Sequence, residues 1–130
     1  LARIRDIDFA LLSSKEEVSI RLTRFLERNR TSATSIGALI TGMNGDCASD
    51  HLYDTVIKDF FKEKPVLTYK NLCGEYPTAI SFATWLAVQI ISGKTPPAEI
   101  QLTPFTTSPE SVLIYNHYKG NMHSFILLGK

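Results

Sequence analysis

The sequence predicts a single α/β domain over residues 1–130, in which a mixed sheet is covered by helices and closed by a β-hairpin. Short apolar runs alternate with segments of helical periodicity along most of the chain, an order typical of a sheet with helices packed on it. The end of the chain is different. Two strand-like runs, 112–118 and 122–128, flank the turn Lys119-Gly120-Asn121, and this pattern indicates a hairpin.

Two helices are predicted from capping residues that stand in front of amphipathic segments. Ser14 and Glu17 form a capping-box pattern before a helix over residues 15–28, in which apolar side chains recur at helical spacing. Ser49 or Asp50 is placed to cap the second helix. Both helices therefore have an identifiable start and one apolar face to bury.

Two buried strands and a third helix follow from the remaining apolar runs. The runs 36–41 and 66–69 are short and bounded by turn residues, which favours strands buried on both faces. Residues 79–91 place apolar side chains on one stripe, and a glycine ends this helix. The proline-rich segment 94–109 is predicted to be an irregular crossing loop, with a short strand near 100–102.

Composition and charge argue against several functional classes. The chain has 130 residues, of which 44% are hydrophobic and 21% charged, as in an ordinary globular domain. A net charge of +1 gives no electrostatic basis for binding nucleic acid or an acidic membrane surface. The longest apolar stretch, 79–91, is too short and too polar to span a bilayer. We therefore expect neither nucleic acid nor membrane as a partner.

The start of the chain and its cysteines bear on its origin. The first residue is Leu1 rather than a methionine, so we expect a trimmed chain or a piece of a longer protein. No basic segment followed by an apolar run is present, so no secretory signal is visible. Cys47 and Cys73 are then expected to stay reduced. Together these features predict a cytoplasmic protein.

Two loops that follow the predicted strands are candidates for chemistry, because ligands of open α/β sheets bind outside the carboxyl ends of the strands. The first loop, 41–46, contains Gly42 and Gly45, which permit unusual backbone angles and a close approach by a ligand. The second loop, 70–79, contains Glu75, whose charge is favourable in front of a helix. Each loop by itself is also what an ordinary strand-to-helix turn requires.

Three segments, taken in order, resemble the C-terminal half of the beta-ketoacyl synthases (3-oxoacyl-acyl-carrier-protein synthases) of the thiolase-like superfamily. Residues 37–54, GALITGMNGDCASDHLYD, resemble the strand and loop that supply the first active-site histidine of that family. Residues 69–91, YKNLCGEYPTAISFATWLAVQII, resemble the segment in which a lysine precedes a Gly-His pair and a buried helix. Residues 111–130, SVLIYNHYKGNMHSFILLGK, resemble the final hairpin beside the substrate thioester.

The resemblance implies a fold, an activity and partners. The fold is the C-terminal half of a thiolase-like fold, without a cofactor or metal. The activity is acyl transfer in fatty-acid or polyketide biosynthesis, on thioesters of the acyl carrier protein. The implied partners are the N-terminal half of the same protein or a ketosynthase partner, and the implied assembly is a homodimer.

Carried over residue by residue, the resemblance also implies a site. Lys70 matches the family lysine, and Glu75 stands where the second active-site histidine is usual. Asn44 lies in the loop where the first active-site histidine is usual, and this loop contains no histidine. Substrate-binding positions are implied at four glycines and at a histidine that replaces the usual asparagine: Gly42, Gly45, Gly74, Gly120 and His123.

These departures alter the expected chemistry. A carboxylate such as Glu75 cannot donate a hydrogen bond to an enolate unless burial keeps it protonated. The amide of Asn44 can still donate to a thioester carbonyl. The family nucleophile, a cysteine, belongs to the N-terminal half. The sequence therefore predicts a ketosynthase-like protein with a diverged site; the alternative is a non-catalytic partner that shapes the acyl tunnel of an active synthase. An unrelated small α/β domain is a third possibility.

Other reactive side chains give weaker hypotheses. Cys73 precedes a helix start, which can lower the pKa of a thiol, but it does not align with the family nucleophile. Cys47 and His51 can share a helix face with Asp50 or Asp54 as metal ligands. No CxxC or HExxH pattern accompanies them, so we predict no metal site.

Overall fold

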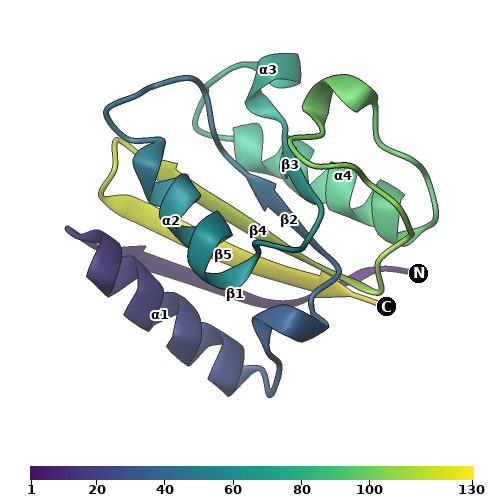
Figure 1. The fold of residues 1–130 in the computed structure, drawn as a ribbon, viewed down its shortest axis with the longest axis horizontal. Helices are drawn as coiled ribbons and strands as arrows, with labels where there is room; N and C mark the ends of the chain where they lie inside the picture. Colours follow the sequence, from purple (N-terminus) through teal and green to yellow (C-terminus); the bar gives the residue numbers. More distant parts are fainter.

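A five-stranded mixed sheet lies at the centre of the computed structural model, which describes residues 1–130 (Figure 1). Its strand order is β1-β5-β4-β2-β3. β2 pairs in parallel with both β3 and β4, whereas β5 is antiparallel to β4 and to β1. The elements follow one another as β1 (Arg3–Leu11), α1 (Lys15–Arg28), β2 (Ala38–Thr41), α2 (His51–Phe60), β3 (Val66–Thr68), α3 (Lys70–Cys73), α4 (Ala79–Ile91), β4 (Ser111–Tyr118) and β5 (Met122–Gly129).

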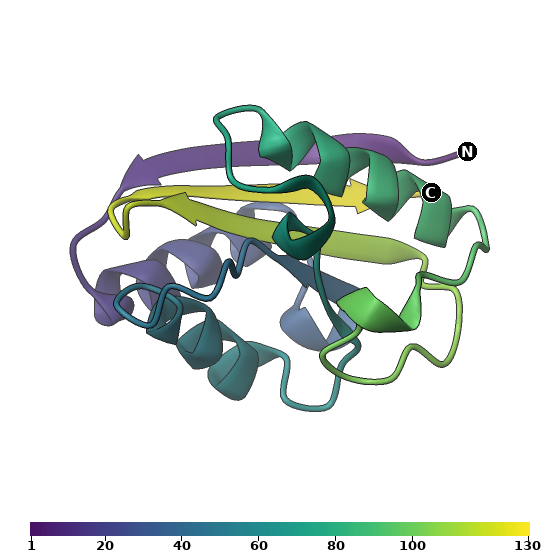
Figure 2. The same ribbon diagram turned by 90° about the horizontal axis from the view of Figure 1, so that it is seen from above.

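The helices form a layer on each face of the sheet, with α1 and α2 on one side and α4 on the other (Figure 2). Alternate residues of the central strand β4 supply the two cores, because successive side chains of a strand point to opposite faces. Leu113 and Tyr115 pack with α1 and α2, while Val112 and Ile114 pack with α4. The predicted α/β class, with a mixed sheet and helices on it, is confirmed.

Several predicted elements are confirmed in detail. The helix over 15–28 is present, and its N-cap Ser14 accepts a hydrogen bond from the backbone N–H of Glu17 at 3.2 Å. The hairpin is also present, with both strands in register around its turn. Asp50 does occupy the N-cap position of α2, but its carboxylate makes no capping hydrogen bond. It accepts instead from the backbone N–H of Gly45 at 2.9 Å.

Two predictions in the loops were wrong. The strand expected near 100–102 is only a 3₁₀ turn at Ala98–Ile100 followed by an isolated bridge between Leu67 and Gln101. The loop expected from residue 70 onward begins with the short helix α3, which ends at Gly74. Beside β3, the N–H groups of Leu102 and Thr103 both donate to the carbonyl oxygen of Val66, so this segment bonds the edge strand without forming a ladder. After β3, the N–H of Gly74 donates to the carbonyl oxygen of Lys70 at 2.8 Å and closes the helical turn.

The N-terminal strand β1 was not predicted, although it carries a two-residue alternation. Asp6 and Asp8 point toward α1, while Ile7, Phe9 and Leu11 point to the opposite face and stay exposed. A strand that packs against a helix normally has apolar residues on the side facing that helix, so the charged residues here hid the strand pattern. The tertiary structure accommodates them with arginines.

Asp8 holds α1 against the edge of the sheet. Its carboxylate is only 6% exposed and accepts from Arg21 at 2.6 and 2.8 Å and from Arg28 at 3.4 Å. The hydrogen bond from Arg21 lowers the pKa of Asp8. A buried carboxylate requires such partners, because an unpaired charge inside a protein is costly.

Replacing Asp8 with alanine is expected to lower the free energy of unfolding at pH 7 by about 1–2 kcal/mol, since the arginines can hydrate once released. Because the pKa of Asp8 is lowered by folding, its contribution is present above pH 4 and is lost as pH falls through the folded pKa. Urea denaturation at pH 7 and pH 3 measures both effects. The matched change Asp59→Ala, at an exposed position of α2, should have little effect. A wild-type–variant gap that does not shrink between pH 7 and pH 3 would contradict this account.

None of the helices is both long enough and apolar enough to cross a lipid bilayer.

Candidate functional site

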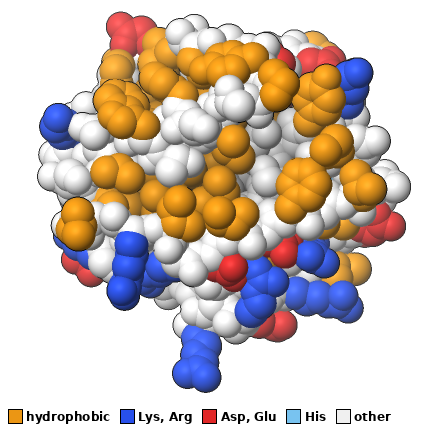
Figure 3. Space-filling view, turned by 180° about the vertical axis from the view of Figure 1, so that it is seen from behind, with side chains coloured by type: hydrophobic (Ala, Val, Ile, Leu, Met, Phe, Trp, Pro, Cys, Tyr) orange, Lys and Arg blue, Asp and Glu red, His pale blue; other side chains and the backbone are white.

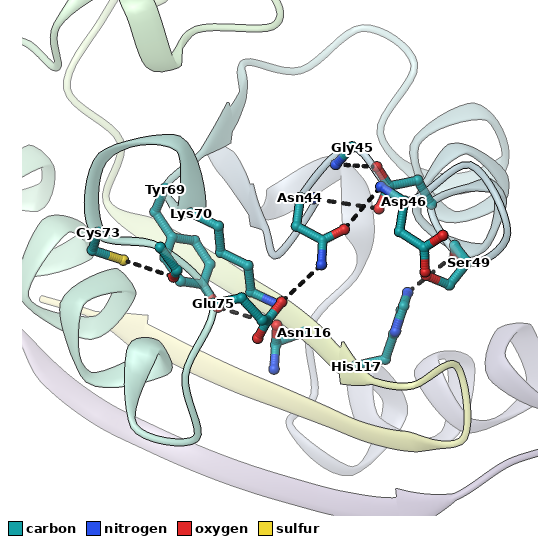
Figure 4. A network of polar contacts seen from close by, with 12 residues as sticks. Asn44, Gly45, Asp46, Ser49, Tyr69, Lys70, Cys73, Glu75, Asn116 and His117 are labelled. Atoms are coloured by element: carbon teal, nitrogen blue, oxygen red, sulfur yellow. Dashed lines mark hydrogen bonds and ion pairs between the residues drawn. The ribbon is translucent and has the colours of Figure 1, made fainter.

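Three loop regions meet at one edge of the sheet because β2 runs parallel to both β3 and β4 (Figure 4). Residues after Thr41 leave the carboxyl end of β2, and residues after Thr68 leave that of β3. The carboxyl end of β4 continues beside them, where the N–H of Gly42 donates to the carbonyl oxygen of Tyr115 at 3.1 Å. This edge therefore gathers polar side chains that are far apart in the sequence.

Glu75 stands at the centre of this edge, between the two residues that were predicted to act with it. One of its carboxylate oxygens, Oε2, accepts from Lys70 Nζ at 2.6 Å and from Asn44 Nδ2 at 2.9 Å. The Lys70 side chain is 3% exposed and that of Glu75 39% exposed. The structure thus brings together the three residues to which a catalytic role was assigned, on loops from two different strands.

Asn44 is fixed in this arrangement by its own loop. Its side-chain oxygen accepts from the N–H of Asp46 at 3.0 Å. The Asp46 carboxylate continues the chain of contacts by accepting from Ser49 Oγ at 2.7 Å, which lowers the pKa of Asp46. One N–H of the Asn44 amide binds Glu75, and the other makes no hydrogen bond within the protein. That second N–H is a donor available to a ligand.

A further polar residue, Asn116, was missed at the sequence level. Its Oδ1 accepts from the hydroxyl of Tyr69 at 3.1 Å and, at 3.5 Å, from that of Tyr53. Tyr53 accepts the N–H of His117 at 2.9 Å, so its own hydrogen is free to point at Asn116. Burial raises the pKa of both phenols, which keeps them protonated as donors. An asparagine inside the apolar run of β4 was the signal that could have revealed it.

Gly42 is needed for this contact, although its backbone angles are ordinary. A Cβ atom on Gly42 would lie 2.0 Å from Oδ1 of Asn116 and 2.7 Å from the hydroxyl of Tyr53. The glycine therefore allows β2 and β4 to bring the asparagine into the site. Gly42 was predicted as a substrate-binding position; the structure shows close packing against a side chain there.

The other predicted glycines have separate structural reasons. Gly45, Gly74 and Gly120 adopt positive φ angles of 87°, 83° and 71°, in the left-handed region that other residues rarely adopt. Gly45 lies in the same loop as Asn44, and Gly74 directly precedes Glu75. Gly120 lies in the hairpin turn, in a second polar cluster with its own hydrogen bonds.

His123 belongs to this second cluster and is fully buried. Its Nδ1 lies 3.0 Å from the hydroxyl of Tyr115, and its Nε2 lies 3.2 Å from the carbonyl oxygen of Gly120. The carbonyl can only accept, so Nε2 carries the hydrogen and Nδ1 accepts from the tyrosine. Both ring nitrogens are thus engaged, and none of these bonds connects His123 to Glu75.

His117 holds the same turn from the other side. Its Nδ1 accepts the N–H of Gly120 at 3.3 Å, and its Nε2 donates to the carbonyl oxygen of Ser49 at 3.1 Å. Burial and the nearby ring of His123 lower the pKa of His117 to about 4. Burial also lowers the pKa of His123. Both rings are therefore neutral at pH 7, and they fix the hairpin turn against the start of α2.

An apolar groove adjoins the polar edge on the α4 side of the sheet. It has a volume of about 470 Å³ and is floored by Ile7, Phe9, Met122 and Ile126, with Ile80 of α4 on its wall. Its polar end carries Lys70, Glu75 and Asn116. Figure 3 shows hydrophobic side chains gathered over this face, with most charged ones toward the lower margin. A polar hollow of about 450 Å³ lies on the other side of Lys70, lined in part by Asn44 and Asp50.

The two cysteines lie outside these bonds. Cys47 is exposed, Cys73 is half-buried, and both are free thiols. No group of three or more His, Cys, Asp and Glu side chains is arranged to hold a metal ion. The hypothetical set of Cys47 and His51 with Asp50 or Asp54 is therefore not assembled.

No protein-family model matches this chain, and no curated protein matches it. The resemblance to beta-ketoacyl synthases is accordingly carried by the order of three segments in the sequence.

The two buried histidines predict an acid-sensitive fold. A neutral histidine whose pKa falls from 6.5 to about 4 on folding contributes its full stability above pH 6.5. That stability is lost as pH falls toward 4, by roughly 3 kcal/mol for His117. Urea denaturation between pH 7 and 4 measures it. The variant His117→Gln should show a shallower pH dependence, whereas His51→Gln, at an exposed position, should keep the wild-type slope.

The close contact at Gly42 predicts coupling with Asn116. Gly42→Ala is expected to lower the free energy of unfolding by about 1–3 kcal/mol, because the new methyl group overlaps the amide. In the double variant with Asn116→Ala, the added cost of the methyl group should fall below half, since its main obstacle is gone. Chemical denaturation of the four proteins completes this cycle. Strictly additive costs would contradict the packing role.

Proposed function

We propose that this chain is the C-terminal half of a beta-ketoacyl-synthase-like protein that acts on acyl-carrier-protein thioesters in the cytoplasm, through a diverged site. One observation carries the proposal. Asn44, Lys70 and Glu75 were assigned to a site from two separate sequence segments, and they converge on one carboxylate oxygen. The parallel pairing of β2 with β3 brings the two segments together, as the proposed site requires.

The arrangement of elements supports the same proposal. The resemblance required a strand, helix, strand, helix and closing hairpin, and this order is present from β2 to β5. The loops that would carry the site all lie at the carboxyl edge of the parallel strands, where ligands of such sheets bind.

The chemistry that these residues can perform is narrower than that of the family. The side-chain amide of Asn116 can donate to a thioester carbonyl at the polar end of the groove, and the free N–H of Asn44 can do so from the adjoining polar hollow. No histidine reaches Glu75, because His117 and His123 are buried and fully bonded in the second cluster. Decarboxylation assisted by two histidines therefore has no support in this half of the protein.

A second candidate function follows from the same observation. Lys70 and Glu75 satisfy each other, and neither cysteine takes part in their network. A non-catalytic subunit that pairs with an active synthase and shapes its acyl tunnel needs no histidine or nucleophile here. The two candidates differ in whether the complete protein accepts an acyl group.

Acyl transfer from a radiolabelled acyl carrier thioester to the complete protein tests the main candidate. A stable acyl-enzyme is expected if the protein remains an acyltransferase, with its label on a cysteine upstream of Leu1. Unlabelled protein that raises the activity of a co-expressed synthase supports the partner subunit instead. If neither outcome is seen, the proposal is wrong in both forms.

The partner proposed for this half is the N-terminal half of the protein or a ketosynthase partner, and it would cover the α4 face. α4 has no charged residue, and its outer surface carries Trp85, whose ring lies 5.4 Å from that of Phe82. Trp85 is 54% exposed, and Phe9 of β1 is 58% exposed. Apolar surface of this kind marks an interaction site.

The isolated chain is therefore expected to self-associate. Sedimentation velocity should detect dimers or larger species at micromolar concentration, because the apolar face has no cover. Phe9→Glu combined with Trp85→Glu should restore a monomer, whereas Ile20→Glu, an equally exposed position on α1, should not. A clean wild-type monomer would count against the covered face.

A further inference from the structure

Two hydrogen-bond donors from different loops converge on a single carboxylate oxygen of Glu75. Lys70 supplies a cation at 2.6 Å and Asn44 an amide N–H at 2.9 Å, both to Oε2. The other oxygen, Oε1, makes no hydrogen bond within the protein. Proteins bind carboxylate ligands with the same kind of donors, a cationic group and a neutral N–H that both donate to the carboxylate.

Lys70 needs an anion at this place. Its side chain is 3% exposed, and Glu75 is its only hydrogen-bonding and ion-pair partner. The ring of Tyr69 lies 6.0 Å from Nζ, at the limit of a cation–π contact. A buried ammonium without a counter-ion is costly, so removal of Glu75 leaves a strong demand for another anion.

Glu75 comes to the pair from the solvent side. It is 39% exposed, and it follows Gly74, where an added Cβ would meet nothing within 4 Å. The pair also lies between two openings. Lys70 lines both the apolar groove of about 470 Å³ and the polar hollow of about 450 Å³. A small acid can therefore reach the place of the Glu75 carboxylate once that side chain is shortened.

We propose that Asn44 and Lys70 form a carboxylate-binding pair that Glu75 occupies from within, so that Glu75 excludes external carboxylates from the site. The inference concerns binding alone and does not depend on acyl transfer. Its extension rests on the proposed function: a thioester that carries a free carboxylate, such as a malonyl group, is refused, and a neutral acyl group is accepted.

Acetate is the probe for this pair. Thermal denaturation and NMR titration of the chain are compared in sodium acetate and in sodium chloride at equal ionic strength and pH 7. Glu75→Ala is expected to melt at a lower temperature than wild type in chloride and to recover in acetate. Its apparent Kd for acetate should be roughly tenfold or more below that of wild type, since each charge-assisted hydrogen bond is worth about that factor.

Matched variants separate this effect from general salt stabilisation. Glu110→Ala also removes a carboxylate from a lysine, because Glu110 pairs with Lys130 at 3.3 Å on the surface. It should show no acetate dependence, since an exposed lysine hydrates. Lys70→Met combined with Glu75→Ala should lose the acetate response, because the cation is gone.

The proposal requires a larger acetate response from Glu75→Ala than from wild type. Equal responses of wild type and Glu75→Ala, or no response of Glu75→Ala, would overturn it. If Glu75→Ala does not fold in chloride, refolding in acetate provides the same test, and failure to refold there also overturns the proposal. The acyl-transfer assay has an independent result, because acetate can bind to a protein that forms no acyl-enzyme.

Discussion

The parallel pairing of β2 with β3 on one side and β4 on the other is the constraint on which the rest of this structure depends. It brings three carboxyl ends to one edge, so residues 44, 70, 75 and 116 become neighbours. Gly42, at the end of β2, leaves room for the Asn116 side chain of β4, since a Cβ atom on residue 42 would overlap it. Without this arrangement, the loops would be ordinary strand-to-helix turns.

Buried charge is handled differently at the two ends of the sheet. Asp8 on the edge strand is held by arginines whose side chains still reach water, and the result is structural support for α1. Lys70 is the deeply buried member of its pair, and its partner Glu75 reaches water. The first arrangement fixes an element of the fold. The second leaves the Glu75 carboxylate, which an external carboxylate could replace, on the solvent side of the pair.

Much of the fold could be predicted from local patterns, and the failures have identifiable causes. The helix at 15–28 and the hairpin at the end depend on capping and turn residues, which act over a few positions. β1 was missed because Asp6 and Asp8 face α1, and their cost is removed only by Arg21 and Arg28 from elsewhere in the chain. Asn116 was missed for a similar reason, because its partners Tyr53 and Tyr69 are more than forty positions away.

The sequence by itself determined the α/β class, most helices and strands, and the loops that would carry polar chemistry, because apolar periodicity and turn residues are local properties. Only the tertiary structure decided which of those residues meet. It joined Lys70, Glu75 and Asn44 at one oxygen and buried His123 with His117 in a separate cluster around Gly120. The physical reason is that hydrogen bonds and ion pairs act only over about 3 Å. Strand order, and not spacing along the chain, decides which side chains come that close.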